Sequence, residues 1–193
     1  TRTEGQIVTD TVVVTGFEPF DGFEVNPSAE AAKALDGRQI GRFRVVGAVI
    51  SLDYEKALEE MWEVIERASP EVILACGQAN RAAVTLEKIA VNALNTQRAD
   101  NYGHTPKNDV ILKDGPAAYF SDLDVHSLTQ VLRDYGIPAE VSYHAGTYGC
   151  NWLFYNLLHW KHSGRIAARV GFVHVPPLPA QAIQKRTSAL PTM

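Results

Sequence analysis

The sequence has little cysteine, no long apolar run and no excess of positive charge. Its 193 residues include two cysteines, Cys76 and Cys150, which is too few for a disulfide framework, and a domain of this size can bury a core without one. No apolar run approaches the roughly 20 residues that a membrane span needs. The formal net charge is −4, which offers no basic surface for a polyanion. We therefore expect no membrane partner, no nucleic-acid partner and a reduced, cytoplasmic setting.

The common motifs for cofactors and metals are also missing. Neither GxGxxG nor GxxxxGK[ST] occurs, so the glycines do not predict a phosphate-binding loop. No cysteine and histidine set has the spacing of a zinc site. We expect neither a cofactor nor a metal ion.

What is present is an alternation of β-branched runs and helical repeats. Strands are expected over residues 11–15, 43–51, 72–75, 82–92, 139–143 and 170–175, and helices over 29–35, 53–68, 123–135 and 150–161. Ser28 is expected to cap the first helix, and 94–117 is expected to form a long functional or oligomer-contact loop. This order predicts one α/β domain over 1–193, with a polar extension at 1–10 and sites beyond the carboxyl ends of the strands.

Cys150 has the surroundings of a reactive thiol. It follows a predicted strand and a turn containing Gly146 and Gly149, and it opens a predicted helix. The helix dipole and free N–H groups at such a position favour thiolate, and the same N–H groups could hold an oxyanion. The alternative is a small buried apolar residue, as most unpaired cysteines are.

A thiolate nucleophile needs a base, and the sequence offers three candidates. His174 lies at the end of a predicted strand, His144 lies six residues before Cys150, and His104 lies in the long polar loop. The strand-end position favours His174, but spacing alone does not choose among the three.

Glu87 is unusual because it interrupts an apolar extended stretch, where a buried charge is costly without a partner. A carboxylate there could orient the base. The alternative is an exposed edge-strand residue paired loosely with Lys88.

The loop after the first predicted strand carries Phe17, Phe20 and Phe23. Aromatic side chains near the carboxyl end of a strand could line an apolar pocket. The alternative is a loop folded over the core.

Together these segments resemble the pyroglutamyl-peptidase I (pyrrolidone-carboxylate peptidase) family of cysteine peptidases. The matching segments are, in chain order, TVVVTGFEPFDGFEVNPS, CGQANR, LEKIAVN, ADNYGHTPKN, DGPAAYFSDL, SYHAGTYGCNWLFYNLLH and GFVHVPPLPAQ. The combination is far more specific than any one motif. The resemblance implies a single domain of three α/β/α layers, in which a twisted mixed sheet lies between helices.

The resemblance also implies an activity and its residues. The activity is removal of N-terminal pyroglutamyl (5-oxoproline) residues from peptides through an acyl-enzyme, without a cofactor, by a cytoplasmic homo-oligomer (tetramer or dimer). The catalytic triad implied by the matching motifs is Cys150, His174 and Glu87. The substrate-binding residues implied in the same way are Phe17 and Phe20, which flank the lactam ring, with Gln78 and Arg81 near it.

Some positions depart from the family pattern. Gly149 stands where a larger apolar residue is expected, Asn80 where a glycine is expected, and Tyr143-His144 where small polar residues are expected. The family also continues past the position of Met193 into a last helix, which we expect to be missing here.

Two alternative functions follow from the same residues. Another thiol amidase or esterase with this triad would turn over acyl substrates that lack the lactam ring. A non-catalytic redox sensor would link Cys76 to Cys150, which requires the two sulfurs to lie close together, whereas the structural interpretation of Cys76 is a buried apolar residue.

Overall fold

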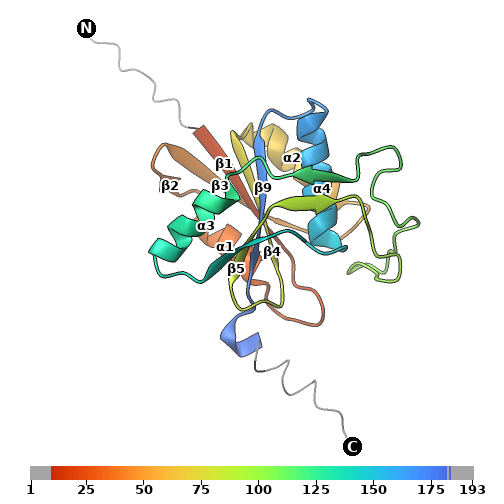
Figure 1. Ribbon diagram of the computed structural model, residues 1–193, viewed down its shortest axis with the longest axis horizontal. Coiled ribbons are helices and arrows are strands. Elements are labelled where there is room, and N and C mark those ends of the chain that lie inside the picture. The colour runs from red at the N-terminus through yellow and green to blue at the C-terminus, as the bar shows by residue number, and fades with distance from the viewer. Residues whose placement is uncertain (1–9, 182, 184–193) are drawn as a thin grey trace, which may run out of the picture.

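A computed structural model describes residues 10–181 and 183 and contains a mixed sheet with helices on both faces (Figure 1). The strand order of the sheet within these residues is β2-β3-β1-β4-β9-β5-β8. Its strands are β1 (Asp10–Phe17), β2 (Gln39–Ile40), β3 (Phe43–Ile50), β4 (Val72–Gln78), β5 (Val84–Glu87), β8 (Ala139–Ser142) and β9 (Arg169–Val175). Strands β6 (Ile89–Val91) and β7 (Ala118–Phe120) pair separately.

The direction of the strands changes once near the site. Strands β3, β1, β4 and β9 run parallel, so their carboxyl ends meet at one edge. Strand β5 is antiparallel to β9 and places Thr85 opposite His174. The sheet is therefore mixed, as the family resemblance implied, and residues from β5 reach the same edge from the opposite direction.

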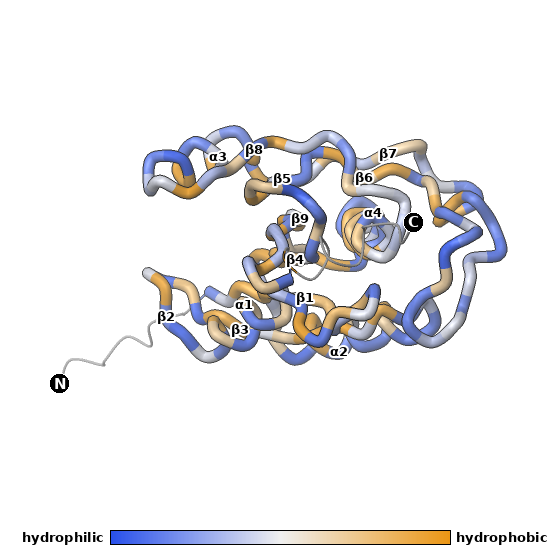
Figure 2. The backbone as a smooth tube through the Cα atoms, turned by 90° about the horizontal axis from the view of Figure 1, so that it is seen from below, coloured by the Kyte–Doolittle hydropathy of each residue, from blue (hydrophilic) through white to orange (hydrophobic). Residues whose placement is uncertain are grey.

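The helices form two layers. Helices α1 (Pro27–Leu35) and α3 (Val125–Asp134) cover one face, and α2 (Ala57–Ala68) and α4 (Gly149–His162) cover the other, as Figure 2 shows to the left and right of the strands. Helix α4 is buried nearly all round, with Leu153, Phe154 and Leu157 fully enclosed. Its apolar composition is thus that of a core helix.

The expected strand over 82–92 is wrong in one respect, because it is two strands in two sheets. The break falls at Lys88, whose N–H donates to the carbonyl of Ser142 and whose carbonyl accepts from Ser121. Residues 89–91 then pair with β7, which the sequence analysis did not predict. Pairing partners from distant segments, rather than local propensity, set this boundary.

The predicted cap of α1 is also corrected. Pro27 occupies the first helical position, so Asn26 becomes the N-cap and its Oδ1 accepts from the N–H of Ser28 at 3.0 Å. The Ser28 hydroxyl instead accepts from the N–H of Phe17 at 3.1 Å and holds the loop after β1. Helix α2 starts at Ala57, later than expected, because Asp53 forms a turn by accepting from the N–H of Glu55 at 2.8 Å.

The expectations for the two chain ends mostly concern residues outside the described ranges. Asp10 already belongs to β1, and the rest of the expected extension lies outside the described residues. Residues 179–181 are helical, and 184–193, where the missing last helix was expected, lie outside the described residues as well. None of the helices in the described ranges has the length and apolar content of a membrane span.

Candidate active site

The predicted strand, glycine turn and helix around Cys150 are all present. Strand β8 leads to Gly146, whose φ of +85° favours glycine, and α4 begins at Gly149. The N-cap residue Tyr148 makes no side-chain hydrogen bond to the helix. The first N–H groups of α4 therefore remain available beside the Cys150 thiol, at the positive end of the helix dipole.

The thiol lies directly against the end of β4. A Cβ added to Gly77 would lie 2.6 Å from Sγ of Cys150 and 3.2 Å from the ring of Phe172. Real carbon and sulfur atoms do not approach so closely, so this position admits only glycine while Sγ stays in place. The glycine of the CGQANR segment thus makes room for the thiol.

The second cysteine faces the other way. Cys76 precedes Gly77 on β4 and packs with Val14 and Val45, whereas Cys150 packs in the core cluster on the opposite face. Burial raises the pKa of the Cys76 thiol to about 12, and the nearby charge of Cys150 adds to the effect. Cys76 is thus a buried structural thiol, and the sheet separates the two sulfurs that the sensor interpretation needed together.

His174 and Glu87 form a buried pair beside the thiol. Nδ1 of His174 lies 2.7 Å from Oε1 of Glu87, and the two residues are 4% and 0% exposed. The antiparallel pairing of β5 with β9 makes them diagonal neighbours on one face of the sheet. A bond through Nδ1 leaves Nε2 of the imidazole for the thiol.

Interactions among these side chains shift the pKa values of His174 and Glu87. Burial lowers the pKa of His174, but the charge and hydrogen bond of Cys150 and the hydrogen bond of Glu87 outweigh it and raise the pKa to about 9. Burial raises the pKa of Glu87, but the hydrogen bond and charge of His174, with Ser142 and Arg81, outweigh it and lower the pKa. At neutral pH the site therefore favours the imidazolium form of His174, paired with the Glu87 carboxylate.

Arg81 binds the same carboxylate oxygen of Glu87 that His174 contacts. Its Nη1 donates to Oε1 of Glu87 at 2.7 Å and to the hydroxyl of Thr85 at 2.6 Å, and its Nη2 donates to the carbonyl of His144 at 2.8 Å. The Thr85 hydroxyl also donates to Glu87 at 3.2 Å. Arg81 thus contacts the predicted triad and does not line the cavity over Cys150.

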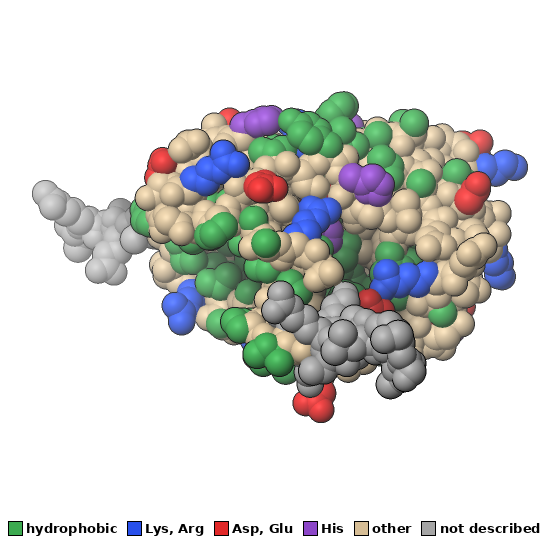
Figure 3. All heavy atoms as spheres, turned by 60° about the horizontal axis from the view of Figure 1, so that its bottom comes forward, with side chains coloured by type: hydrophobic (Ala, Val, Ile, Leu, Met, Phe, Trp, Pro, Cys, Tyr) green, Lys and Arg blue, Asp and Glu red, His purple; other side chains and the backbone are tan. Residues whose placement is uncertain are grey.

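A cavity of about 340 Å³ opens over the thiol at the carboxyl ends of β1, β4 and β9. Figure 3 shows this end of the molecule, with histidine and basic side chains around a hollow near its centre. Of the predicted substrate-binding residues, Phe20 and Gln78 line the cavity, and Phe17 does not, because it packs in the core with 1% exposure. The lining residues are Phe20, Asp21, Phe23, Gln78, Ala79, Asn80, Asn95, Arg98, Ala145, Gly146, Thr147, Tyr148, Cys150, His174 and Pro177.

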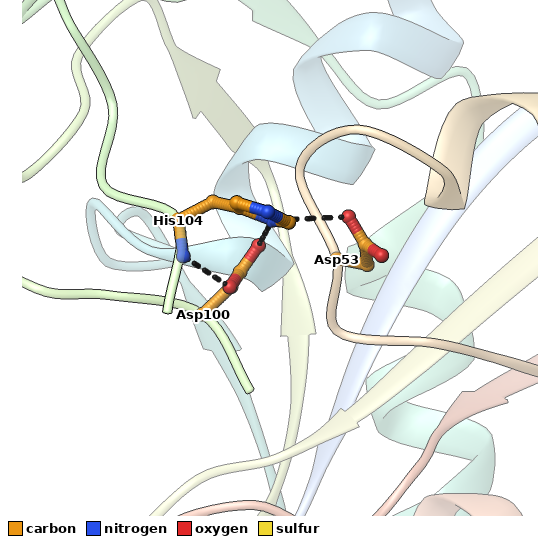
Figure 4. Close-up of side chains that lie close together, drawn as sticks. All are labelled: Asp53, Asp100 and His104. Atoms are coloured by element: carbon orange, nitrogen blue, oxygen red, sulfur yellow. Dashed lines mark hydrogen bonds and ion pairs between the residues drawn. The ribbon is translucent and has the colours of Figure 1, made fainter. Parts of the chain in front are cut away.

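The structure places the other two candidate bases away from this cavity. His104 lies between two buried carboxylates, with Nδ1 at 3.3 Å from Asp100 and 3.5 Å from Asp53 (Figure 4). Ligand-type atoms of these three residues lie within 4.8 Å of one another, but both carboxylates already accept backbone N–H groups. His144 is exposed; its carbonyl accepts from Arg81, and its Nδ1 accepts from the N–H of Gly146 at 2.8 Å. Of the three histidines, His174 is the one beside Cys150.

The family whose description is "Pyroglutamyl peptidase" matches residues 10–193. This chain belongs to the pyroglutamyl peptidase family. A pyrrolidone-carboxylate peptidase of Pectobacterium carotovorum is 46% identical over 173 residues, which cover 89% of this chain and 80% of that protein. A protein of the same name from Vibrio vulnificus is 41% identical over 172 residues, with the same coverage of 89% and 80%.

Solved structures of pyroglutamyl peptidases share the fold. Pyroglutamyl peptidase I of Bacillus amyloliquefaciens superposes with a TM-score of 0.88 at 37% identity and covers 95% of this chain and 87% of that one. Pyrrolidone carboxyl peptidase of Thermococcus litoralis gives a TM-score of 0.85 at 39% identity, covering 89% of this chain and 79% of that one. The chain is therefore a cysteine peptidase of the three-layer α/β type.

The departures from the family pattern have local explanations in two cases. A side chain at Gly149 would collide with Cδ1 of Leu52, so Leu52 fills the space of the larger apolar residue that the pattern led us to expect. Asn80 lines the cavity, so its side chain adds a polar group there. Tyr143 is 58% exposed, and nothing in the structure explains its identity.

Sequence reasoning missed a pair of charged residues at the cavity. Asp21 and Arg98 both line it and bind each other, although 77 residues separate them in the chain. No local pattern marked either residue, because the pairing depends on how two loops meet in the fold.

Proposed function

We propose that this chain removes the N-terminal pyroglutamyl residue from peptides, with Cys150 as nucleophile, His174 as acid and base, and Glu87 as the residue that orients His174. One observation carries the proposal. The Cys150 thiol stands at the start of α4 beside the buried imidazole of His174, whose other nitrogen lies 2.7 Å from Glu87. This is the order of groups that an acyl-transfer triad requires.

In the first half of the reaction, the Cys150 thiolate attacks the carbonyl carbon of the pyroglutamyl residue. The oxyanion that forms is stabilised by free N–H groups in the first turn of α4. The imidazolium of His174 then gives its proton to the leaving nitrogen, and the carbon–nitrogen bond breaks. The products are a pyroglutamyl thioester on Cys150 and the shortened peptide.

In the second half, water hydrolyses the thioester. His174 takes a proton from the attacking water, and the carbon–sulfur bond then breaks to leave the Cys150 thiolate beside the imidazolium of His174. Free 5-oxoproline leaves. Glu87 keeps its negative charge throughout and stabilises the imidazolium at Nδ1.

The cavity suits a small neutral ring. Phe20 offers an apolar wall, and the amide of Gln78, which also accepts a long hydrogen bond of 3.4 Å from Gln181, lies beside it. A lactam combines apolar ring carbons with one N–H and one C=O, so a cavity with an apolar wall and polar side chains beside it matches the ring. We assign Arg81 a positioning role through Glu87 in place of the substrate contact that the family resemblance implied.

We also propose a cytoplasmic location, a homo-oligomeric state (tetramer or dimer) and a single domain over 1–193. The location is supported by the need of a thiol nucleophile for a reducing environment and by the free thiols of Cys76 and Cys150. Sedimentation of the purified full chain tests the oligomeric state, and a monomer at micromolar concentration would contradict it.

The activity itself is tested with a fluorogenic pyroglutamyl amide. We expect release of the fluorophore by the reduced protein, loss of at least about 1,000-fold in Cys150→Ser, and no release from the alanyl amide of the same fluorophore. The matched control is Cys76→Ser, which changes the other thiol and should retain activity if it folds. No release by folded, reduced protein would refute the proposal, and cleavage of the alanyl amide would favour the broader amidase.

A further inference from the structure

An arginine and an aspartate meet at the cavity beyond the triad. Nη2 of Arg98 lies 2.8 Å and 2.6 Å from the two carboxylate oxygens of Asp21. The guanidinium also stacks on Tyr148, with Cζ 3.7 Å from the ring centroid. Arg98 and Asp21 are 39% and 52% exposed, and both line the cavity that holds Cys150.

Hydrogen bonds on either side of Arg98 tie its segment to the turn before α4. The N–H of Asn95 donates to the carbonyl of Thr147 at 2.8 Å, and the hydroxyl of Tyr148 donates to the carbonyl of Ala99 at 2.7 Å. The segment that carries Arg98 therefore runs beside the turn that leads into the Cys150 helix. Asp21 comes from the separate loop after β1, so the ion pair joins two loops at the cavity.

The charge state of this pair matters for the substrate ring. A pyroglutamyl ring is a neutral lactam, whereas a prolyl N-terminus has the same five-membered ring with a protonated amine. An unpaired carboxylate in the cavity would attract the cation and would have to lose water to admit the neutral ring. An arginine that donates to both carboxylate oxygens offsets the negative charge and occupies an acceptor site on each oxygen.

We propose that Arg98 is a specificity-determining residue that masks Asp21, so that the cavity admits neutral lactam rings and does not bind cationic N-terminal amines. The inference rests on the proposed function, since it concerns the ring that the site accepts. In the same way, Asp21 neutralises the positive charge of the Arg98 guanidinium in the cavity.

The test measures binding of two small rings that lack a scissile bond. These are neutral 2-pyrrolidone and cationic pyrrolidinium, and their Kd values are determined by NMR titration of the full chain at low ionic strength. Arg98→Gln should bind pyrrolidinium about fivefold more tightly relative to 2-pyrrolidone than the wild type does, the size expected for a partly exposed ion pair. Asp21→Asn should shift the ratio in the opposite direction, and the double variant should return it to within about twofold of wild type.

The opposite directions of the two shifts in the Kd ratio distinguish charge masking from a purely structural contact between the loops. If the pair only held the loops together, both single variants would lose that tie and would shift the ratio in the same direction or not at all, which overturns the inference. The matched control is Arg42→Gln, because Arg42 also pairs with an aspartate, Asp10 at 2.8 Å, and stacks on Phe43 at 5.1 Å, outside the cavity lining. It should leave the ratio unchanged.

Different results would contradict the proposed function and the proposed role of Arg98. Absence of hydrolysis of the pyroglutamyl amide by the wild type removes the proposed function, while the Kd ratios still report on Arg98. Normal hydrolysis with an unchanged Kd ratio in Arg98→Gln removes only the specificity inference. High salt should reduce the effect of Arg98→Gln, because it screens the unmasked carboxylate.

Discussion

The tight fit between Gly77 and the Cys150 thiol yields a sharp prediction for Gly77→Ala. The added methyl group would lie 2.6 Å from Sγ of Cys150 and 3.2 Å from the ring of Phe172. Optimal contacts between such atoms are about 3.5–4.0 Å. The sulfur must therefore move by roughly 1 Å, or the strand must move by a similar amount.

The cost of that movement can be worked out for both activity and stability. A displacement of about 1 Å at reacting atoms costs about 100-fold in rate, which is about 2.7 kcal/mol of transition-state stabilisation. Overpacking a filled core costs about 1–3 kcal/mol of unfolding free energy, which a domain stable by about 5–15 kcal/mol survives. Gly77→Ala should therefore fold and lose about 100-fold in kcat/KM.

The assay is hydrolysis of the fluorogenic pyroglutamyl amide, with unfolding in urea measured in parallel. Gly171→Ala is the matched control, because its methyl group would meet the flexible side chain of Leu123 on the other face of the sheet from Cys150. It should lose stability and keep its activity. A kcat/KM for Gly77→Ala within threefold of the wild-type value would refute the placement of the thiol against β4.

Three further perturbations test other parts of the account. Glu87→Gln removes a negative charge from His174, whose pKa is about 9, so the fall of kcat/KM at alkaline pH should move to lower pH and the plateau should drop at least about tenfold. Arg81→Gln removes a donor that lies 2.7 Å from Glu87; kcat should fall about tenfold with little change in KM, and Arg81→Lys should restore part of it. Asn26→Ala removes the N-cap of α1 and should lower the unfolding free energy by about 1–2 kcal/mol in urea titrations.

Each of these has an outcome that contradicts it. An unchanged alkaline limb in Glu87→Gln would mean that the carboxylate does not set the proton affinity of His174. A rise in KM at constant kcat in Arg81→Gln would point to direct substrate binding. For Asn26→Ala, the control is Lys33→Ala, which removes only an exposed pair with Glu30 at 3.0 Å and should change stability by less than about 0.5 kcal/mol.

Much of the fold follows from local pattern, and the exceptions have a common cause. Helices with a clear apolar stripe, such as α2, and apolar runs such as β4 lie close to where the sequence placed them. The boundary between β5 and β6 does not, because it depends on pairing with β8, β9 and β7 from distant parts of the chain. Short segments without an apolar period carry too little local signal to predict such pairing.

The candidate site shows the same division between local and long-range information. The helix start at Cys150 is readable from the glycine turn before it, whereas the choice of His174 over His104 needed either the family resemblance or the structure. Phe17 illustrates the limit of an aromatic pattern, since it ends β1 inside the core while Phe20, three residues later, lines the cavity. Packing in the fold decides whether a side chain faces the core or the cavity, and the spacing of residues in the sequence does not specify it.

Direct observation of the acyl-enzyme tests the central claim most sharply. The reduced protein is mixed with a pyroglutamyl ester, quenched in acid within milliseconds to seconds, and examined by intact-mass measurement and peptide mapping. The account predicts a mass increase of one pyroglutamyl group on the peptide that contains Cys150, with the peptide that contains Cys76 unmodified. Turnover without any such adduct, or an adduct on Cys76, would contradict the assignment of Cys150 as the nucleophile.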